Sequence, residues 1–296
     1  MVSHVDFFGC KHPIVCVSMN YVSDVNLAVA VHKAGGMPSL FLESNRLDLK
    51  LDTLSNELDE FKSRTNSDKV IVTIPNETMI YAMKMLVEKQ VKFVELIGGY
   101  GREDENLVYN LVQYLRKRGT KVMFKQPPAG YYLLPYLDAV SLKGVEAAGA
   151  VSNEDLKSLE TVVHKFKEVN PHIPIIATGG VATKKQIDTL LKLGAMAVGI
   201  GTLFAASAES RVSDATKQLM IDTSQSEIHG NAHNSFIIKH RYIKLPTPYT
   251  GLDDNNKSNS LQYGIAGEGG HIYAGTGVSE IKEILTVEQI IDRLTQ

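Results

Sequence analysis

Residues 173–204 have the sequence IPIIATGGVATKKQIDTLLKLGAMAVGIGTLF. It contains two short apolar runs, Ile175–Thr178 and Ala197–Ile200, and the segment between them, Thr183–Leu193, has the spacing of an amphipathic helix. Short β-rich runs that alternate with amphipathic helices are typical of βα units around a parallel sheet. The stretch therefore predicts two neighbouring parallel strands joined by a helix.

The same alternation extends back to the N-terminus. Further candidate strands are Ile14–Ser18, Pro38–Leu42, Val70–Ile74, Phe93–Ile97, Lys121–Lys125 and Ala139–Leu142. Helical patterns lie between them at Asp24–Lys33, Leu51–Ser63, Thr78–Lys89, Glu103–Arg118 and Asn153–Val169, with a short turn near Tyr131–Leu134. Strict alternation of this kind favours an α/β fold closed into a (β/α)8 (TIM) barrel, although counting strands leaves an open doubly wound sheet as the alternative.

Capping residues explain several of the predicted helix limits. Asp24 is suited to the N-cap of the first helix, and Gly35-Gly36 ends it. Ser152 or Asn153 is the expected N-cap of the helix that runs to Val169.

The regular alternation stops after the eighth strand. A helical stretch to about Asp222 is followed by Thr223–Gly277, which is rich in Asn, Gly, Ser and His and too long for an ordinary connection. It is either a lid over the strand ends or a partly mobile insertion, with GLDDNNKSNS at 251–260 as the expected disordered part. We thus expect one domain with a barrel core at 1–222, an insertion at 223–277, and a closing segment at 278–296 with a helix from Val287 to Leu294.

Composition limits the classes of partner. Lys and Arg number 31 against 33 Asp and Glu, and no long block of one sign occurs, so neither nucleic acid nor an anionic membrane is expected. A small-molecule site is the better expectation. Cys10 and Cys16 form neither a disulfide framework nor a CxxC motif and are interpreted as reduced, packed thiols. The start MVSHVDFFGCKHP lacks a secretory pattern, so a cytoplasmic protein is expected.

Glycines follow the last two strands. Thr178-Gly179-Gly180 ends the seventh strand and Gly199-Ile200-Gly201-Thr202 ends the eighth. Glycine lets the backbone approach an anion closely, and this end of a barrel is the usual phosphate position. The plainer alternative is that both are only tight turns. The pattern predicts a phosphate group without specifying the ligand that carries it.

Longer motifs point to a family. The stretch quoted above, together with HPIVCVSMNYVSDVNLAVAVHKAGG at 12–36, DAVSLKGVEAAGAVSNEDL at 138–156 and GIAGEGGHIYAG at 264–275, resembles the nitronate monooxygenase family and its relatives, the FMN-dependent enoyl-ACP reductases. The resemblance implies FMN at the carboxyl ends of the strands. It assigns cofactor binding to Met19, Thr73, Lys125, Gly144, Gly149, Gly179, Gly180, Gly201 and Thr202.

Lys125 also has a physical argument. A lysine at the end of the fifth strand would direct its ammonium into the barrel mouth, where it can stabilise negative charge on a reduced flavin. The alternative is a lysine that forms an ion pair on the surface.

One departure from the family affects the chemistry. The family has a proposed catalytic histidine where this chain has Ala150, at the end of Gly144-Val145-Glu146-Ala147-Ala148-Gly149. A general base contributes a factor of about 10²–10⁴ in rate, so oxidation of a neutral nitroalkane should be impaired. A nitronate is already an anion and remains a suitable substrate.

Two residues are candidates to replace that histidine. Lys143 stands where the family usually has an acidic or amide residue, and it either forms a local ion pair with Glu146 or transfers protons with a lowered pKa. His271 lies in a segment that returns to the flavin in the family. His229 and His233 lack the glutamate of an HExxH motif, so no metal site is predicted.

Three functional hypotheses follow. The first is an FMN-dependent oxidoreductase that oxidises a small nitronate or similar carbanion-like substrate with oxygen. The second is an enoyl reductase that uses NADH or NADPH. The third is a protein that binds FMN or phosphate and has lost the family's chemistry. The expected partners are a small-molecule substrate, the nicotinamide cofactor under the second hypothesis, and a second copy of the chain as a candidate homodimer.

Overall fold

The computed structural model describes residues 2–45, 48–98, 105–127, 131–152, 157–223, 227–229, 238–244 and 257–296. Its central sheet has 8 parallel strands in the order β1-β11-β10-β8-β7-β6-β5-β2. These are β1 (Ile14–Cys16), β2 (Ser39–Phe41), β5 (Ile71–Pro75), β6 (Phe93–Ile97), β7 (Lys121–Lys125), β8 (Ala139–Lys143), β10 (Ile175–Thr178) and β11 (Ala197–Ile200).

The first and last strands of this order meet. A parallel bridge joins Val15 to Met37, just before β2. The Cys16 N–H donates to the Met37 carbonyl at 2.9 Å, and the Met37 N–H donates to the Ile14 carbonyl at 2.8 Å. The predicted (β/α)8 barrel is therefore confirmed, and the open sheet is wrong.

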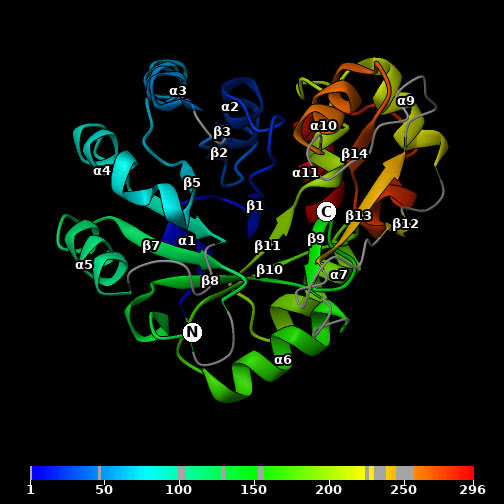
Figure 1. Ribbon diagram of the computed structural model, residues 1–296. Helices are drawn as coiled ribbons and strands as arrows, with labels where there is room; N and C mark the ends of the chain where they lie inside the picture. Colours follow the sequence, from blue (N-terminus) through cyan, green and yellow to red (C-terminus); the bar gives the residue numbers. More distant parts are fainter. Residues whose placement is uncertain are drawn as a thin grey trace.

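Helices surround the strands, as Figure 1 shows. They are α2 (Val25–Lys33), α3 (Leu51–Thr65), α4 (Met79–Glu88), α5 (Glu105–Arg116), α6 (Leu159–Val169), α7 (Lys184–Lys192), α8 (Thr202–Ala205), α9 (Asp214–Asp222), α10 (Lys257–Ala266) and α11 (Val287–Thr295). Short 3-10 turns lie at η1 (Asn76–Thr78), η2 (Leu134–Tyr136) and η3 (Thr276–Glu280), and β3 (Ser44–Asn45) pairs with β4 (Asp48–Leu49). None of the helices in the described part of the chain has the length and apolar character needed to cross a bilayer.

The predicted caps are right at one helix and wrong at another. The Asp24 carboxylate accepts the Leu27 N–H at 3.0 Å and caps α2. The helix expected from Asn153 instead begins at Leu159 with Ser158 as its N-cap. Gly149–Ser152 forms strand β9, which pairs with β13 (Ile238–Lys244). Pairing with a strand far away in the sequence thus overrides the local capping signal of Ser152.

A second, antiparallel sheet stands beside the barrel. It consists of β9, β12 (Glu227–His229), β13 and β14 (His271–Tyr273). Figure 1 shows it next to α10 and α9. In the GLDDNNKSNS stretch, residues 251–256 lie outside the described residues, and Lys257–Ser260 belong to α10 rather than to a disordered segment.

A short N-terminal helix, α1 (His4–Phe8), was not predicted. Its Phe7 and Phe8 are buried in a cluster with residues from the starts of the barrel strands: Val15, Met37, Ile71, Phe93, Met123, Ala139, Ile176 and Ala197. Lys121 ties the helix to β7 by donating from Nζ to the Phe7 carbonyl at 2.6 Å. The helix therefore plugs the amino end of the barrel.

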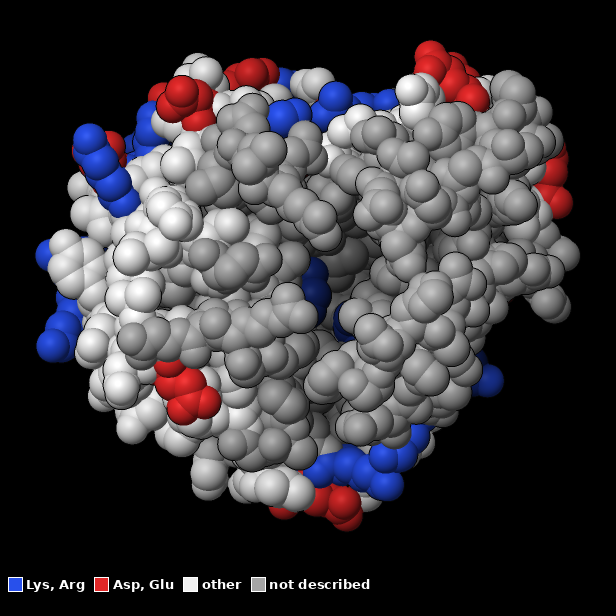
Figure 2. Space-filling view, viewed as in Figure 1, with Lys and Arg blue, Asp and Glu red and all other residues white. Residues whose placement is uncertain are grey.

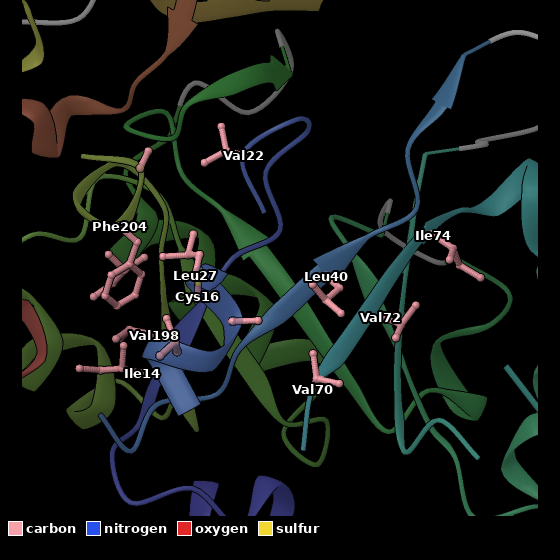
Figure 3. Packing of buried hydrophobic residues seen from close by; sticks show 14 of the residues in the cluster. Ile14, Cys16, Val22, Leu27, Leu40, Val70, Val72, Ile74, Val198 and Phe204 are labelled. Atoms are coloured by element: carbon pink, nitrogen blue, oxygen red, sulfur yellow. The ribbon is translucent and has the colours of Figure 1, made fainter. Parts of the chain in front are cut away.

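The larger core lies between the strands and the surrounding helices. Figure 3 shows part of it, including Ile14, Leu40, Val72 and Val198 from the strands with Leu27 and Phe204 from the helices.

Cys10 and Cys16 are free and buried, as predicted, and burial raises the pKa of Cys16 to about 12. One end of the barrel interior is thus plugged by α1, and the other end carries the site described next.

Candidate functional site

A cavity opens at the carboxyl ends of the barrel strands. Figure 2 shows a hollow in the middle of this face with Lys or Arg atoms inside it. The cavity is lined by Val17, Ser18, Met19, Asn20, Val22, Lys125, Lys143, Ala147, Ala148, Gly149, Thr178, Gly179, Gly180, Val181, Gly199, Gly201, Thr202, Ala205, Leu261, Ile272, Tyr273 and Gly277. Leu261 of α10, with Ile272 and Tyr273 of β14, brings residues from beyond the barrel into its wall.

The glycines after β10 are required by the backbone. Gly179 has a φ of +111° and Gly180 a φ of +70°, a region that other residues rarely adopt. A Cβ on Gly179 would lie 2.7 Å from the Ala147 Cβ, and one on Gly180 would collide with Glu146. Bare backbone therefore borders the cavity here, as close approach of a phosphate requires.

Most of the predicted cofactor residues line the cavity together: Met19, Lys125, Gly149, Gly179, Gly180, Gly201 and Thr202. Thr73 and Gly144 do not line it. Thr73 is fully buried inside the barrel, where its hydroxyl donates to Glu95. A Cβ on Gly144 would collide with the backbone of Leu159 and with the Glu146 carboxylate, so this glycine serves the packing of the turn after β8.

Glu95 is a site residue that the sequence analysis missed. It lies on β6 with a side chain that is only 6% exposed, and its carboxylate forms an ion pair with Lys125 at 3.0 Å. The Ser141 hydroxyl donates to Oε1 at 2.5 Å, and the Thr73 hydroxyl donates to Oε2 at 3.1 Å. Lys125 also donates to the Ser18 hydroxyl at 3.2 Å. The predicted surface alternative for Lys125 is therefore wrong, because its partner is a carboxylate inside the barrel.

Strand alternation contains the signal for Glu95. Phe93 faces the barrel interior in the α1 cluster, and side chains two apart on a strand point the same way, so residue 95 faces inward as well. A carboxylate at such a position requires a buried partner.

Lys143 ends β8 and lines the cavity. Its Nζ donates to the Ala148 carbonyl at 3.1 Å, and its backbone N–H donates to the Gln126 side chain at 2.6 Å. Burial, together with the nearby charge of Lys125, lowers the pKa of Lys143 to about 8, and Glu95 opposes part of that effect. The proposed pairing with Glu146 is wrong: the Glu146 carboxylate instead accepts the Leu159 N–H at 3.2 Å.

The remaining predicted residues lie around the second sheet. His271 is buried on β14 with its ring centroid 4.9 Å from that of Tyr273, and it is not among the cavity-lining residues. The backbone of Ala150 lies on β9 opposite His240 of β13. His229 lies on β12 and His233 lies outside the described residues. Within the described ranges, no group of His, Cys, Asp and Glu is arranged to hold a metal ion.

Comparison with known proteins identifies similar chains. A family model described as nitronate monooxygenase matches residues 115–296. A nitronate monooxygenase of Metarhizium robertsii is 33% identical over 78 residues, which is 26% of this chain and 22% of that protein. A probable nitronate monooxygenase of Bacillus subtilis is 23% identical over 183 residues, which is 54% of this chain and 51% of that protein. The matched regions thus span about a fifth and about half of these relatives.

Solved structures match over nearly the whole chain. FabK from Thermotoga maritima has a TM-score of 0.81 at 25% identity, covering 98% of this chain and 94% of its own. A nitroalkane oxidase from Streptomyces ansochromogenes has a TM-score of 0.77 at 20% identity, covering 99% and 96%. At that identity the second match supports the fold alone.

Proposed function

Because the chain belongs to the nitronate monooxygenase family, we propose that it oxidises a small nitronate or a similar carbanion-like substrate with oxygen. The family is one of FMN-dependent oxidoreductases, and FMN is the cofactor. The observation that carries the proposal is the cavity at the strand ends, which combines glycine backbone on one wall with the Lys125 ammonium on another.

The residues around the cavity suit FMN. Gly179, Gly180 and Gly201 would hold the phosphate with their backbone and Thr202 with its hydroxyl, since all four line the cavity. Met19, Lys125 and Gly149 would lie along the ring. Thr73 and Gly144 would act indirectly, Thr73 through Glu95 and Gly144 through the turn after β8. Residues 223–277 would act as a lid, because Leu261, Ile272 and Tyr273 already form part of the wall.

The substrate class follows from the proton chemistry. Bound FMN supplies the electron-accepting ring, and the chain must supply charge, orientation and proton transfer. Lys125, held by Glu95, provides a positive charge beside the cavity. Ala150 cannot accept a proton, so a substrate that arrives as an anion needs the least from this site. Of the two replacement candidates, Lys143 is favoured over His271 because Lys143 is among the cavity-lining residues and His271 is not.

An enoyl reductase that draws electrons from NADH or NADPH is the second candidate. The similarity to FabK over 98% of the chain favours it. The third hypothesis, a binding protein without redox activity, has Ala150 as its main support.

The test is the visible spectrum of the purified protein, followed by anaerobic additions. A flavin spectrum bleached by a nitronate supports the oxidase, and one bleached by NADH or NADPH supports the reductase. A flavin spectrum that neither the nitronate nor NADH or NADPH changes supports the third hypothesis, a binding protein without redox activity. Absence of flavin after incubation with FMN would contradict the FMN-based hypotheses and leave only a phosphate-binding barrel.

A further inference from the structure

Residues 275–277, with the sequence Gly-Thr-Gly, connect the second sheet to the barrel. They follow β14, whose Ile272 and Tyr273 form part of the cavity wall, and they lead into η3. We call residues 275–277 the joining segment. Its position along the chain means that whatever holds this segment also holds the end of the wall strand.

The joining segment is bonded to two parts of the barrel mouth. The Gly275 N–H donates to the hydroxyl oxygen of Thr202, the first residue of α8, at 2.9 Å. The Thr276 N–H donates to the carbonyl of Glu146, in the turn after β8, at 3.0 Å. Both bonds join residues that lie far apart in the sequence, so they fix the segment against the barrel.

Close packing leaves little room for the segment to shift. A Cβ on Gly275 would lie 2.7 Å from the Glu146 carbonyl oxygen, so only glycine fits there. A Cβ on Gly180 would lie 2.6 Å from the Thr276 hydroxyl oxygen. The segment therefore lies directly against the glycine turn after β10 that is proposed to receive the phosphate.

The Thr202 hydroxyl links the joining segment to the cavity. A threonine hydroxyl has one hydrogen to donate and two lone pairs that accept. One lone pair accepts the Gly275 N–H, and no acceptor within the described residues receives the Thr202 hydrogen. Because Thr202 lines the cavity, this hydrogen can be donated to a phosphate oxygen bound there.

The other serine and threonine hydroxyls of the lining have different partners. The Thr178 hydroxyl donates to the Leu142 carbonyl at 2.9 Å. The Ser18 hydroxyl accepts from Lys125 at 3.2 Å. In the described part of the chain, Thr202 is thus the lining hydroxyl that contacts the joining segment.

We infer that Gly275 is a positioning residue for the cofactor phosphate and acts through Thr202. Its N–H holds the Thr202 hydroxyl as a donor toward the cavity. A phosphate oxygen that accepts from Thr202 strengthens the Gly275 bond in turn, because hydrogen bonds in a chain polarise one another. The inference rests on the proposed function, since it takes FMN as the ligand.

The link gives the two sides of the cavity a common support. Coupling between two sites is reciprocal, so a segment that favours phosphate binding is itself held more firmly once phosphate is bound. Ile272 and Tyr273 precede this segment on the chain and face the cavity. Cofactor loading therefore fixes the wall before the substrate arrives.

Hydrogen–deuterium exchange tests the inference without any redox turnover. The flavin-free protein is compared as the original chain, as Thr202→Val, which keeps the shape without the hydroxyl, and as Thr202→Ser, which keeps the hydroxyl. Mass spectrometry follows peptides that cover residues 271–277. We expect exchange there to be about fivefold faster in Thr202→Val, as the loss of one hydrogen bond implies, and nearly unchanged in Thr202→Ser. The Val122 N–H, which donates to Asp138 at 2.8 Å at the amino end of β7, is the internal reference.

FMN is then added at a concentration that fluorescence quenching shows to be saturating. We expect it to slow exchange at residues 271–277 about tenfold in the original chain and in Thr202→Ser, within the usual range of coupling between sites, but much less in Thr202→Val. Riboflavin, which lacks the phosphate, should have little effect. Equal slowing by FMN in Thr202→Val and Thr202→Ser, or equal slowing by riboflavin and FMN, would overturn the inference.

Gly275→Ala covers the case in which Thr202→Val does not fold. Its Cβ would meet the Glu146 carbonyl and displace the N–H from Thr202, while Thr202 itself remains. We expect FMN affinity to fall about tenfold. Unchanged affinity in folded Gly275→Ala would overturn the inference. An original chain that binds no FMN contradicts the proposed function, whereas FMN that binds without slowing exchange at residues 271–277 contradicts this inference alone.

Discussion

Lys143 links the chemistry of the site to the stability of the fold. Its pKa is about 8 in the folded chain against an ordinary 10.5, with burial as the main cause. Between these two values the unfolded chain binds more protons than the folded chain, so this residue makes the free energy of unfolding rise with pH. Below pH 8 the buried Lys143 ammonium lowers the free energy of unfolding by a constant amount.

We therefore predict that Lys143→Met is more stable than the original chain at pH 7, and that the difference shrinks as the pH rises from 8 to 10.5. The expected difference at pH 7 is of the order of a few kcal/mol at most. Urea unfolding followed by circular dichroism at pH 7, 8, 9 and 10 measures it. Two stability curves that stay parallel over this range would contradict the predicted charge state of Lys143.

Ala150 supports a prediction about substrate choice. Ala150→His introduces an imidazole at the position where the sequence resemblance implies the family's histidine, so oxidation of a neutral nitroalkane should rise, by up to about 10²-fold. Oxidation of the matching nitronate needs no deprotonation and should change little. Oxygen consumption with each substrate gives the two rates. An equal gain on both would mean that the imidazole acts by something other than proton transfer.

The glycine turns matter at the scale of elements, because they join strands and helices: Gly180 follows β10, and Gly119 lies between α5 and β7. Gly180 has a φ of +70° and Gly119 a φ of +82°, but a Cβ on Gly119 would have nothing within 4 Å. Gly180→Ala and Gly119→Ala should each lose about 1 kcal/mol through backbone strain, and Gly180→Ala should lose more because its Cβ would collide with Glu146. Only Gly180→Ala should also lose FMN affinity, by at least about tenfold or 1.4 kcal/mol.

Thermal unfolding and titration of FMN fluorescence separate the two effects of these substitutions. If Gly119→Ala weakened FMN binding as much as Gly180→Ala, the glycine at 180 would be needed for conformation only.

The elements that the sequence could predict are those formed by local patterns. The eight barrel strands and the helices α2, α3, α4, α7 and α11 lie within a few residues of their predicted limits. Strand β9 could not be predicted, because residues 149–152 pair with residues 238–241 and nothing local encodes that contact. The glycine and lysine residues of the cavity were found from motifs. Glu95 lies in an apolar run, and its role becomes visible only when Lys125 and Ser141, on the next two strands of the sheet, contact its carboxylate.

At the scale of the whole molecule, a cluster that stabilises the barrel and the cavity proposed to bind FMN lie at opposite ends of the barrel. Its amino end is filled by α1, and its carboxyl end holds the cavity. Phe8 is 2% exposed, so Phe8→Ala should lower the free energy of unfolding by about 3–5 kcal/mol. FMN affinity should not change, since the deletion is at the opposite end.

Val5→Ala, on the same helix but 54% exposed, is the control and should change stability by less than about 0.5 kcal/mol. Urea unfolding and FMN titration of both variants check the separation. A loss of FMN affinity in Phe8→Ala would mean that the two ends of the barrel are mechanically coupled.

Strand β13 pairs with β9 through residues 238–241 and with β14 through residues 242–244. One strand thus connects the segment after β8 with a segment that the chain reaches only after β11. Contacts between such distant segments form late, because the chain entropy of closing long loops must be overcome first. During refolding, far-UV circular dichroism should recover before the ability to quench FMN fluorescence. A newly synthesised chain would then pass through a stage with most of its secondary structure formed and its flavin still free in solution, so the supply of FMN would limit maturation only at the last step.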